Sequence, residues 1–262
     1  MFFTSIAART DLGLVRTGNE DSALHHPKLI AVADGMGGAA GGEVASKIAI
    51  QTLGEVIATI ASGDIDDDSR VDLLQSAPLR IEGELAATIT SKSELAGMGT
   101  TLTALMPVKD AVAMLHVGDS RCYRVRKGEI TRLSYDHTVV QELIDQGKIT
   151  ADEAADHPQR SMLTQALMGK GDPNFENYPI QLFPAEPGDF YLVASDGLTA
   201  VLNEEMILKV ITANSIEAGV NNLVALVRDG GAPDNVTIVL AEFGSQANDS
   251  HSSPSFIGAA YE

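Results

Sequence analysis

Residues 29–36 read LIAVADGM, an apolar run rich in β-branched residues that ends in Asp34 and a glycine. A short apolar run bounded by a turn pair predicts a buried strand. Two further runs repeat the pattern, since MLHVGDS ends in Asp119 and FYLVASDG ends in Asp196. A fourth, GAPDNVTIVL, carries Asp234 just before its strand begins. Each of these predicted strands therefore has an aspartate at one end.

These strand-end aspartates indicate a site for divalent cations. In an antiparallel arrangement the four ends can lie on one edge, where the carboxylates would repel each other and lose hydration unless cations lie among them. Oxygen ligands without a His or Cys cluster favour Mg²⁺ or Mn²⁺ over Zn²⁺. Two such ions about 3.5–4 Å apart can activate a bridging water and neutralise a phosphate oxygen. An aspartate before glycine is also a common turn pair, but four in this context favour chemistry that hydrolyses a phosphate ester.

The remaining pattern predicts an α+β layered domain. Strands are expected at 29–33, 111–117, 189–194 and 236–243, with a hairpin of 121–126 and 129–133. Helices are expected at 43–61, at 70–95 with an interruption near Pro78, and from about Asn203 and Ser215. The stretch Thr138–Gly171 is predicted to be a helical insertion, and a capping-box pattern starts at Thr150. Residues 62–69 and the tail 244–262 are expected to be poorly ordered.

Composition excludes several classes of protein. The chain has 262 residues, 18 Lys plus Arg against 36 Asp plus Glu, and a net charge of −18, so nucleic acid is an unexpected partner. The lone Cys122 allows no internal disulfide, which fits a reducing compartment. No apolar run is expected to span a bilayer, and the N-terminus lacks the basic region and apolar core of a signal peptide.

An N-terminal segment adds further candidates. Residues 11–21, DLGLVRTGNED, contain Arg16, Glu20 and Asp21. The guanidinium of Arg16 has the geometry to hold a phosphate through two hydrogen bonds, although a surface ion pair is an equal alternative.

Six motifs occur in one order along the chain. They are DLGLVRTGNEDS, VADGMGGAAGGEVAS, GMGTTLTAL, HVGDSRCYRVRKGEITRLSYDHT, LVASDGLTAVL and GAPDNVTIVL. From about Asp11 to Leu240 this series resembles the bacterial form of the metal-dependent serine/threonine protein phosphatase family called PPM or PP2C. The resemblance implies a four-layer α/β/β/α sandwich in which two antiparallel sheets are flanked by helices. It also implies two Mn²⁺ or Mg²⁺ ions, with a third, weaker site.

The resemblance assigns roles to individual residues. Asp34 would bridge both metals and the Gly35 carbonyl would bind one of them, while Asp196 and Asp234 would hold the other. Glu20 and Asp21 would contribute directly or through water, Asp119 would mark the third site, and Arg16 would contact the substrate phosphate. The catalytic set is therefore Asp34, Asp196, Asp234 and Arg16. Positions 99–101 and Asn235 would orient these ligands.

One position departs from the animal members of the family. They have a histidine two residues after the aspartate of the DG motif, where this chain has Met36. A thioether cannot donate a proton, so the general acid would be a metal-bound water or a flap residue such as His157.

The expected organisation is a catalytic domain over 1–243, with a flap at about 138–171, and a disordered tail over 244–262. The expected activity is hydrolysis of phosphoserine and phosphothreonine by a metal-activated water. Expected partners are substrates of a eukaryotic-like serine/threonine kinase and the kinase itself. We expect a monomer in the cytoplasm, tethered to a membrane if this chain is a trimmed catalytic domain.

Two alternatives remain. The glycines of residues 35–40 imitate a dinucleotide fingerprint, but that interpretation leaves the other strand-end aspartates unexplained. A catalytically silent phosphoprotein-binding module on the same fold would be expected to have lost metal ligands, whereas each carboxylate position of the pattern is filled here.

Overall fold

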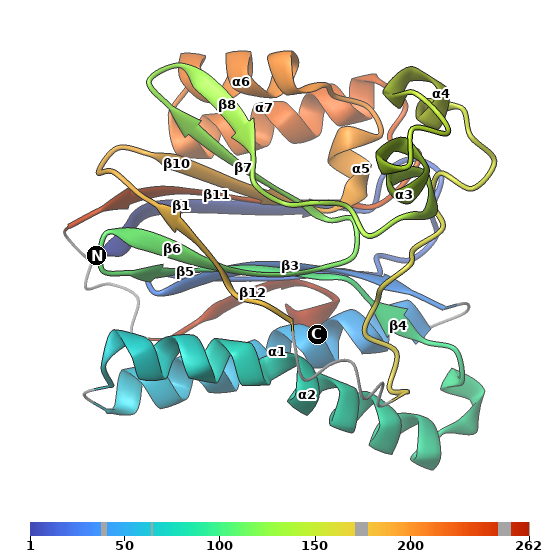
Figure 1. The fold of residues 1–262 in the computed structure, drawn as a ribbon, viewed down its shortest axis with the longest axis horizontal. Helices are drawn as coiled ribbons and strands as arrows, with labels where there is room; N and C mark the ends of the chain where they lie inside the picture. The colour runs from blue at the N-terminus through green and yellow to red at the C-terminus, as the bar shows by residue number, and fades with distance from the viewer. Residues whose placement is uncertain (38–40, 64, 171–177, 246–252, 262) are drawn as a thin grey trace.

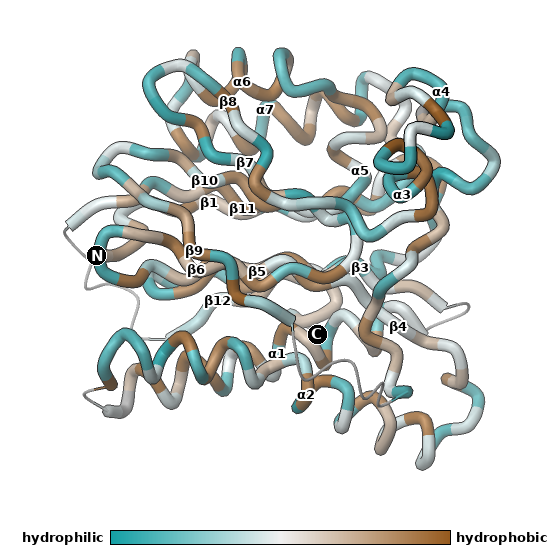
Figure 2. The backbone as a smooth tube through the Cα atoms, in the orientation of Figure 1, coloured by the Kyte–Doolittle hydropathy of each residue, from teal (hydrophilic) through white to brown (hydrophobic). Residues whose placement is uncertain are grey.

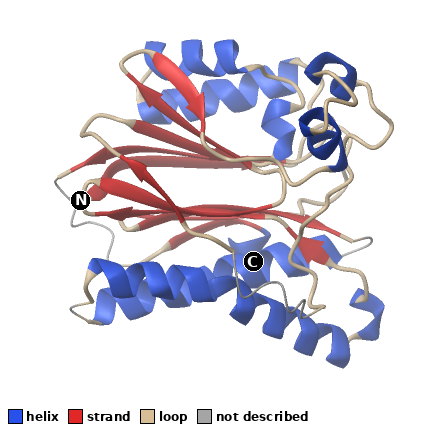
Figure 3. Ribbon diagram, viewed as in Figure 1, coloured by secondary structure: helices blue, strands red, loops and turns tan. Residues whose placement is uncertain are grey.

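The fold is a sandwich of two antiparallel β-sheets with helices on both outer faces (Figure 1). The computed structural model describes residues 1–37, 41–63, 65–170, 178–245 and 253–261. Helices α1 and α2 cover one sheet and helices α6 and α7 cover the other, which gives four layers (Figure 3). The predicted α/β/β/α sandwich is therefore confirmed.

The first sheet has five strands in the order β1-β11-β10-β7-β8. Its strands are β1 (Phe2–Asp11), β11 (Val236–Gly244), β10 (Phe190–Ala194), β7 (Arg121–Arg126) and β8 (Glu129–Arg132). The predicted hairpin is present as β7 and β8, with Lys127 and Gly128 in its turn at positive φ. The sheet thus joins the first strand of the chain to one of its last.

The second sheet has seven strands, in the order β12-β2-β3-β5-β6-β9 with β4 paired to β3. These are β12 (Ser255–Gly258), β2 (Asp21–His26), β3 (Leu29–Met36), β4 (Gly99–Thr100), β5 (Leu102–Val108), β6 (Ala111–Val117) and β9 (Gln181–Pro184). Each strand pair in both sheets is antiparallel. This topology excludes the dinucleotide alternative, because that fold needs parallel strands around its glycine-rich turn.

The helices are amphipathic elements that bury one face against a sheet. The longer ones are α1 (Gly41–Ser62), α2 (Asp67–Ser91), α6 (Glu204–Ala213) and α7 (Ile216–Asp229), and the shorter ones are α3 (Val139–Asp145), α4 (Ala151–Ala155) and α5 (Asp196–Thr199). Two 3₁₀ turns lie at Ser93–Leu95 and Ala259–Tyr261. Side-chain caps begin α6 at Asn203 and α7 at Ser215, and Thr150 and Glu153 form the predicted capping box of α4.

Helix α1 is long and apolar enough, by length and composition, to cross a membrane over Gly41–Ala61. From the sequence, no apolar run is expected to span a bilayer. In this fold 56% of that window is buried, and Ala45, Ala49 and Leu53 belong to the core between α1 and its sheet.

Buried apolar side chains form three layers, and Figure 2 colours the backbone by the hydropathy of each residue. One lies between each sheet and its helices, and the third lies between the two sheets. In that central layer Tyr191 packs edge-to-face against Phe3 and Phe243, with ring centroids 6.1 and 6.3 Å apart. Such aromatic pairs add to the stability gained by burial. All three rings come from strands of the first sheet, so they join its neighbouring strands on the face that meets the second sheet.

Two expectations are wrong, namely the interruption of a helix near Pro78 and the poor order of residues 62–69. Helix α2 runs through Pro78 without a break, because burial of Leu74, Ala77 and Ile81 on one face compensates for the lost hydrogen bond. Its N-cap is Asp66, whose side chain accepts a hydrogen bond from the Ser69 backbone N–H, so the predicted loop at 62–69 is partly helical.

The predicted disordered tail is also wrong for residues 253–261. Strand β12 pairs with β2, and the side chain of Phe256 lies against Gly54 of α1, where a β-carbon on that glycine would be 2.7 Å from the ring. Backbone pairing and apolar packing therefore order a segment whose composition indicates a polar coil. The part of the expected tail at 246–252 lies outside the described residues, as does Gly171 at the end of the predicted flap.

Candidate metal centre

The four strand-end aspartates lie at one end of the sandwich. Asp34 lies within β3, Asp119 follows β6, Asp196 is the first residue of α5 directly after β10, and Asp234 precedes β11 by two residues. All four line a single cleft of about 490 Å³, together with Arg16, Glu20 and Gly35. The structure thus brings together strand ends that are far apart in the sequence.

Asp21 lies beneath this cleft and does not line it. It is 1% exposed and is paired in register with Asp34 on the neighbouring strand. Its carboxylate accepts a hydrogen bond of 2.7 Å from the Ser195 hydroxyl, and Ser195 Oγ accepts one of 2.9 Å from the Thr237 backbone N–H. Asp21 is therefore placed to act from behind Asp34.

Residues 100 and 101 fix the backbone of Asp34. The Thr101 N–H donates to the Asp34 carbonyl at 2.9 Å, and the Asp34 N–H donates to Thr101 Oγ1 at 3.0 Å. The Thr100 hydroxyl donates to the same carbonyl at 3.0 Å. The two threonines thus orient Asp34 from its own backbone, as the resemblance implied.

Asn235 braces the loop of residues 12–18, which follows β1. Its amide nitrogen donates to the carbonyls of Leu12 and Gly18 at 2.9 and 3.0 Å, and its oxygen accepts the Glu20 N–H at 2.9 Å. The loop also approaches the chain before β11 closely. Gly13 has φ +78°, and a β-carbon there would collide with the Asp234 carbonyl. One buried side chain therefore ties the Arg16 loop and Glu20 to the segment that carries Asp234.

Burial makes ionisation of these carboxyl groups unfavourable. It raises the pKa of Asp21 to about 7 and that of Asp119 to about 7, and it raises the pKa of Asp34 well above its usual range. Burial followed by the charge of Asp234 raises the pKa of Asp196, while a hydrogen bond with Asp34 opposes that rise. Each of these groups is thus a largely buried acid without enough positive charge around it.

The donor set fits a hard divalent cation. Carboxylate oxygens and the Gly35 carbonyl are the ligands that Mg²⁺ and Mn²⁺ prefer, and a cation would stabilise the ionised form of every acid whose pKa is raised. Within the described part of the chain, however, no three His, Cys, Asp or Glu side chains converge closely enough to form a finished ligand cage. The cleft carboxylate of Asp234 is engaged by Arg16 and by the Asn235 backbone N–H, and the carboxylate of Asp21 beneath the cleft is engaged by Ser195.

Arg16 forms an ion pair, which is the alternative to phosphate binding that the sequence left open. Its partner is Asp234, one of the predicted metal ligands. Its Nη2 lies 2.6 Å from Asp234 Oδ2, and its side chain is 49% exposed. Because Arg16 also lines the cleft, its guanidinium is positioned both to hold Asp234 and to meet an anion that enters.

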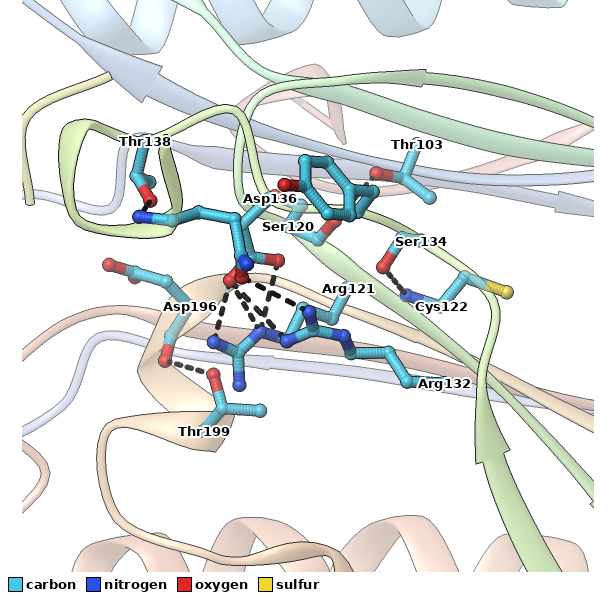
Figure 4. Close-up of polar contacts among 12 residues, drawn as sticks. Thr103, Ser120, Arg121, Cys122, Arg132, Ser134, Asp136, Thr138, Asp196 and Thr199 are labelled. Carbon is cyan, nitrogen blue, oxygen red and sulfur yellow. Dashed lines mark hydrogen bonds and ion pairs between the residues drawn. The ribbon is translucent and has the colours of Figure 1, made fainter. Parts of the chain in front are cut away.

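A wider part of the cleft, of about 960 Å³, extends toward the flap helices α3 and α4. Arg121 and Asp136 form a bidentate pair on its wall, with hydrogen bonds of 3.0 and 2.6 Å to Asp136 Oδ2, and Arg132 lies 3.6 Å from the same oxygen (Figure 4). Ser161 of the flap lines both parts of the cleft. The sequence pattern does not mark Asp136 or Ser161, because neither stands at the end of a predicted strand.

The flap is attached to the metal centre through Thr100. Leu167 and Thr100 exchange two backbone hydrogen bonds of 2.9 Å, and the Met168 N–H donates to the buried carboxylate of Glu82 on α2 at 2.8 Å. Since Thr100 also holds the Asp34 carbonyl, the flap and Asp34 share a support.

His157 is not brought to the site. It lines neither part of the cleft, and its Nδ1 accepts the N–H of Gln159 at 3.1 Å. Met36 does line the cleft, so the position that is a histidine in animal members of the family is occupied by a side chain without a transferable proton.

The chain is similar to known protein phosphatases. A family model described as Protein phosphatase 2C matches residues 18–225. The chain is 42% identical over 240 residues to the serine/threonine protein phosphatase PstP of Mycobacterium tuberculosis, which covers 90% of this chain and 44% of PstP. It is 32% identical to the protein phosphatase PhpP of Streptococcus pneumoniae, over 92% of this chain and 98% of PhpP.

A solved structure is also similar. The crystal structure of the PstP catalytic domain in complex with two manganese ions has a TM-score of 0.82 and 37% identity, over 92% of this chain and 99% of that one. The chain spans less than half the length of PstP itself.

Proposed function

Because the chain belongs to the protein phosphatase 2C family, we propose that it is a metal-dependent protein phosphatase acting on phosphoserine and phosphothreonine. The observation that carries the proposal is the convergence of Asp34, Asp119, Asp196 and Asp234 on one cleft that also contains Arg16. The proposed cofactors are two Mn²⁺ or Mg²⁺ ions, with a third, weaker site at Asp119. The related catalytic domain that binds two manganese ions supports this assignment.

Bound metal ions would supply positive charge and an activated water for attack on phosphorus. The residues of this chain hold and orient the reacting groups. Asp34, Asp196, Asp234 and the Gly35 carbonyl would present oxygen ligands, with Glu20 beside them in the cleft and Asp21 behind Asp34. The guanidinium of Arg16 positions the substrate phosphate through paired hydrogen bonds. Thr100, Thr101 and Asn235 keep these groups in place through the backbone contacts described above.

Glu20 is the candidate ligand whose carboxylate is bound by the first turn of helix α1. Its carboxylate accepts a hydrogen bond from the backbone of Gly42 in the first turn of α1, while burial raises the pKa of Glu20. A carboxylate at a helix N-terminus is stabilised by the helix dipole. Helix α1 therefore orients Glu20 toward the cleft. The backbone of Gly35 also approaches the Gly42 carbonyl so closely that a β-carbon at position 35 would collide with it, which leaves room only for glycine there.

The proposed substrates are phosphorylated proteins, including those of a eukaryotic-like serine/threonine kinase and the kinase itself. The net charge of −18 gives the protein no general attraction for such substrates, so recognition depends on the local site. We further propose that the protein acts as a monomer in the cytoplasm. The one cysteine, Cys122, is buried, which is compatible with a reducing compartment.

The test is hydrolysis of p-nitrophenyl phosphate and of a phosphothreonine peptide by chelator-treated protein, with Mn²⁺, Mg²⁺, Ca²⁺ or no metal added back. Turnover that is absent without metal and restored by Mn²⁺ or Mg²⁺ supports the proposal. Folded protein that shows no turnover with any of these metals contradicts it and favours the silent phosphoprotein-binding module, for which binding of the same peptide is then measured.

A further inference from the structure

Apolar side chains are exposed next to two residues that line the cleft, Arg16 and Ser161. The set consists of Leu12, Leu14 and Val15, from the loop before Arg16, and Met162 of the flap, with exposed fractions of 39%, 56%, 67% and 50%. We call these four residues the apolar rim. Leu14 and Val15 directly precede Arg16, and Met162 directly follows Ser161. Since Arg16 and Ser161 both line both parts of the cleft, the rim is continuous with it.

The loop that carries most of the rim is firmly held. The Leu14 N–H donates to the Ala232 carbonyl at 2.9 Å, and the Gly13 N–H donates to Asp11 Oδ1 at 2.9 Å. Arg228 Nη1 lies 2.6 Å from the same Asp11 oxygen. With the Asn235 brace, these contacts fix the backbone on both sides of Leu14 and Val15. Their exposure is therefore imposed by a defined backbone conformation.

The flap side is held in a similar way. The Met162 carbonyl accepts the Val139 N–H at 2.9 Å, and an isolated bridge pairs Leu163 with Thr138 at the start of α3. In Figure 1 the loop after β1 and the flap helices α3 and α4 lie at the same end of the sandwich. The rim thus has two fixed sides, one on each side of the opening.

Exposed apolar side chains scattered singly are ordinary on protein surfaces. Here three exposed apolar side chains, those of Leu12, Leu14 and Val15, lie within four residues on a constrained loop next to a cleft. Such a cluster is more typical of a contact surface. The protein has a net charge of −18, which repels an acidic phosphoprotein. Contact between apolar side chains does not depend on charge, so it can contribute to binding despite this repulsion.

We propose that the apolar rim binds apolar side chains that flank the phosphorylated residue of a protein substrate. The phosphate enters at Arg16, and the neighbouring residues of the substrate chain extend over Leu14 and Val15 on one side and Met162 on the other. The rim makes the enzyme selective for phosphorylation sites with apolar neighbours. This inference rests on the proposed phosphatase function and specifies its substrate class.

The test compares two phosphothreonine peptides that differ only in whether leucine or serine flanks the phosphothreonine, with p-nitrophenyl phosphate as a reference that has no flanking residues. The double variant Leu14→Ser, Val15→Ser is expected to raise KM for the leucine peptide about tenfold. This is the loss of affinity expected when part of the apolar area buried by the two side chains is removed. The ratio of kcat/KM for the leucine peptide to that for the reference should fall by the same factor. Met162→Ser should act in the same direction.

The matched control is Leu182→Ser on β9, where a leucine 59% exposed lies on an edge strand outside the lining of the cleft. It should leave the peptide-to-reference ratio at its wild-type value. Thermal unfolding confirms that each variant is folded.

The inference is overturned if the wild-type protein does not distinguish the two peptides, or if the rim variants lower kcat/KM for the reference and both peptides equally. It is also overturned if the rim variants leave peptide KM unchanged but abolish binding of the protein to phosphatidylglycerol vesicles, which would make the rim a membrane contact. Failure of the phosphatase proposal is a separate result, because it removes turnover of p-nitrophenyl phosphate by the wild-type protein with Mn²⁺.

Discussion

Asp21 on β2 is paired in register with Asp34 on β3, so a fully buried carboxyl group stands directly opposite the one at the cleft on adjacent strands. Directly opposed residues in an antiparallel pair lie on the same face of the sheet, and like charges there destabilise the fold. The charge of Asp21 contributes to the raised pKa of Asp34, after burial itself. We therefore expect this pair to contribute to the response of the protein to pH and to removal of metal ions.

The metal-free protein should lose stability as the pH rises from about 4 to about 7. An aspartate titrates near pH 4 in the unfolded chain, whereas Asp21 in the fold has a pKa of about 7. Between these values the folded chain binds more protons than the unfolded chain, so the free energy of unfolding falls with rising pH. Asp21→Asn removes this penalty, and in chelator its Tm should exceed that of the wild type at pH 8 but not at pH 4.

Mn²⁺ is the control for that experiment. A cation favours the ionised carboxylates, so metal should raise the Tm of the wild type at pH 8 by more than it raises that of Asp21→Asn. An equal effect of Mn²⁺ on both proteins would show that Asp21 does not contribute to metal binding.

Asp34→Asn and Asp196→Asn should each reduce turnover of p-nitrophenyl phosphate by about a thousandfold or more, because each removes a charged ligand at the reaction centre. Both side chains keep nearly the same volume, so the fold is retained. Asp152→Asn, on an exposed turn of α4, serves as the control. Near wild-type kcat in either cleft variant would remove that aspartate from the catalytic site.

Arg16→Ala should have two opposite effects. KM for a phosphopeptide should rise about tenfold or more, since a charged hydrogen-bonding partner of the phosphate is lost. At the same time less Mn²⁺ should be needed for half-maximal activity, because Arg16 no longer holds Asp234 Oδ2. Arg16→Lys separates charge from geometry, as a lysine keeps the charge but not the paired hydrogen bonds. An unchanged KM in Arg16→Ala would assign Arg16 to the ion pair alone.

Asn235→Ala should lower the Tm by about 3–10 °C. The substitution removes the hydrogen-bonding partner of the Glu20 N–H and of the Leu12 and Gly18 carbonyls. A buried polar group left without a partner lowers the free energy of unfolding by about 1–3 kcal/mol, which corresponds to a Tm shift of this size. Faster proteolysis within residues 12–18 should accompany the loss. Asn222→Ala is the matched control, because that exposed asparagine bonds only to Asn214 at 3.1 Å among the hydrogen bonds given by the structure.

Much of the fold and the site follows from local sequence. The four strand-end aspartates are predicted to share an edge, and they do, because each follows or precedes an apolar run that could only be a buried strand. The caps of α4, α6 and α7 are likewise visible as Thr150, Asn203 and Ser215.

Other features depend on contacts between distant segments. Strand β12 lies in a tail rich in Ser, Gly and Ala whose composition predicts a coil, and it is ordered because it pairs with β2 and packs Phe256 against α1. The support of Asp21 by Ser195, and of the Arg16 loop by Asn235, joins residues 174 to 223 positions apart. No local pattern marks such partners, and Asp136 and Ser161 escape prediction for the same reason.

The pairing of β1 with β11 has a consequence for how the chain folds. Among the described strands, β11 is the only sheet partner of β1, and the bond from Thr4 to the Glu242 carbonyl joins residues 238 positions apart. Strand β1 therefore stays without this partner until residues 236–244 have been synthesised, and folding that depends on such distant contacts is slow. Until residues 236–244 are available, β1 exposes an open strand edge, which is a site for pairing with other chains.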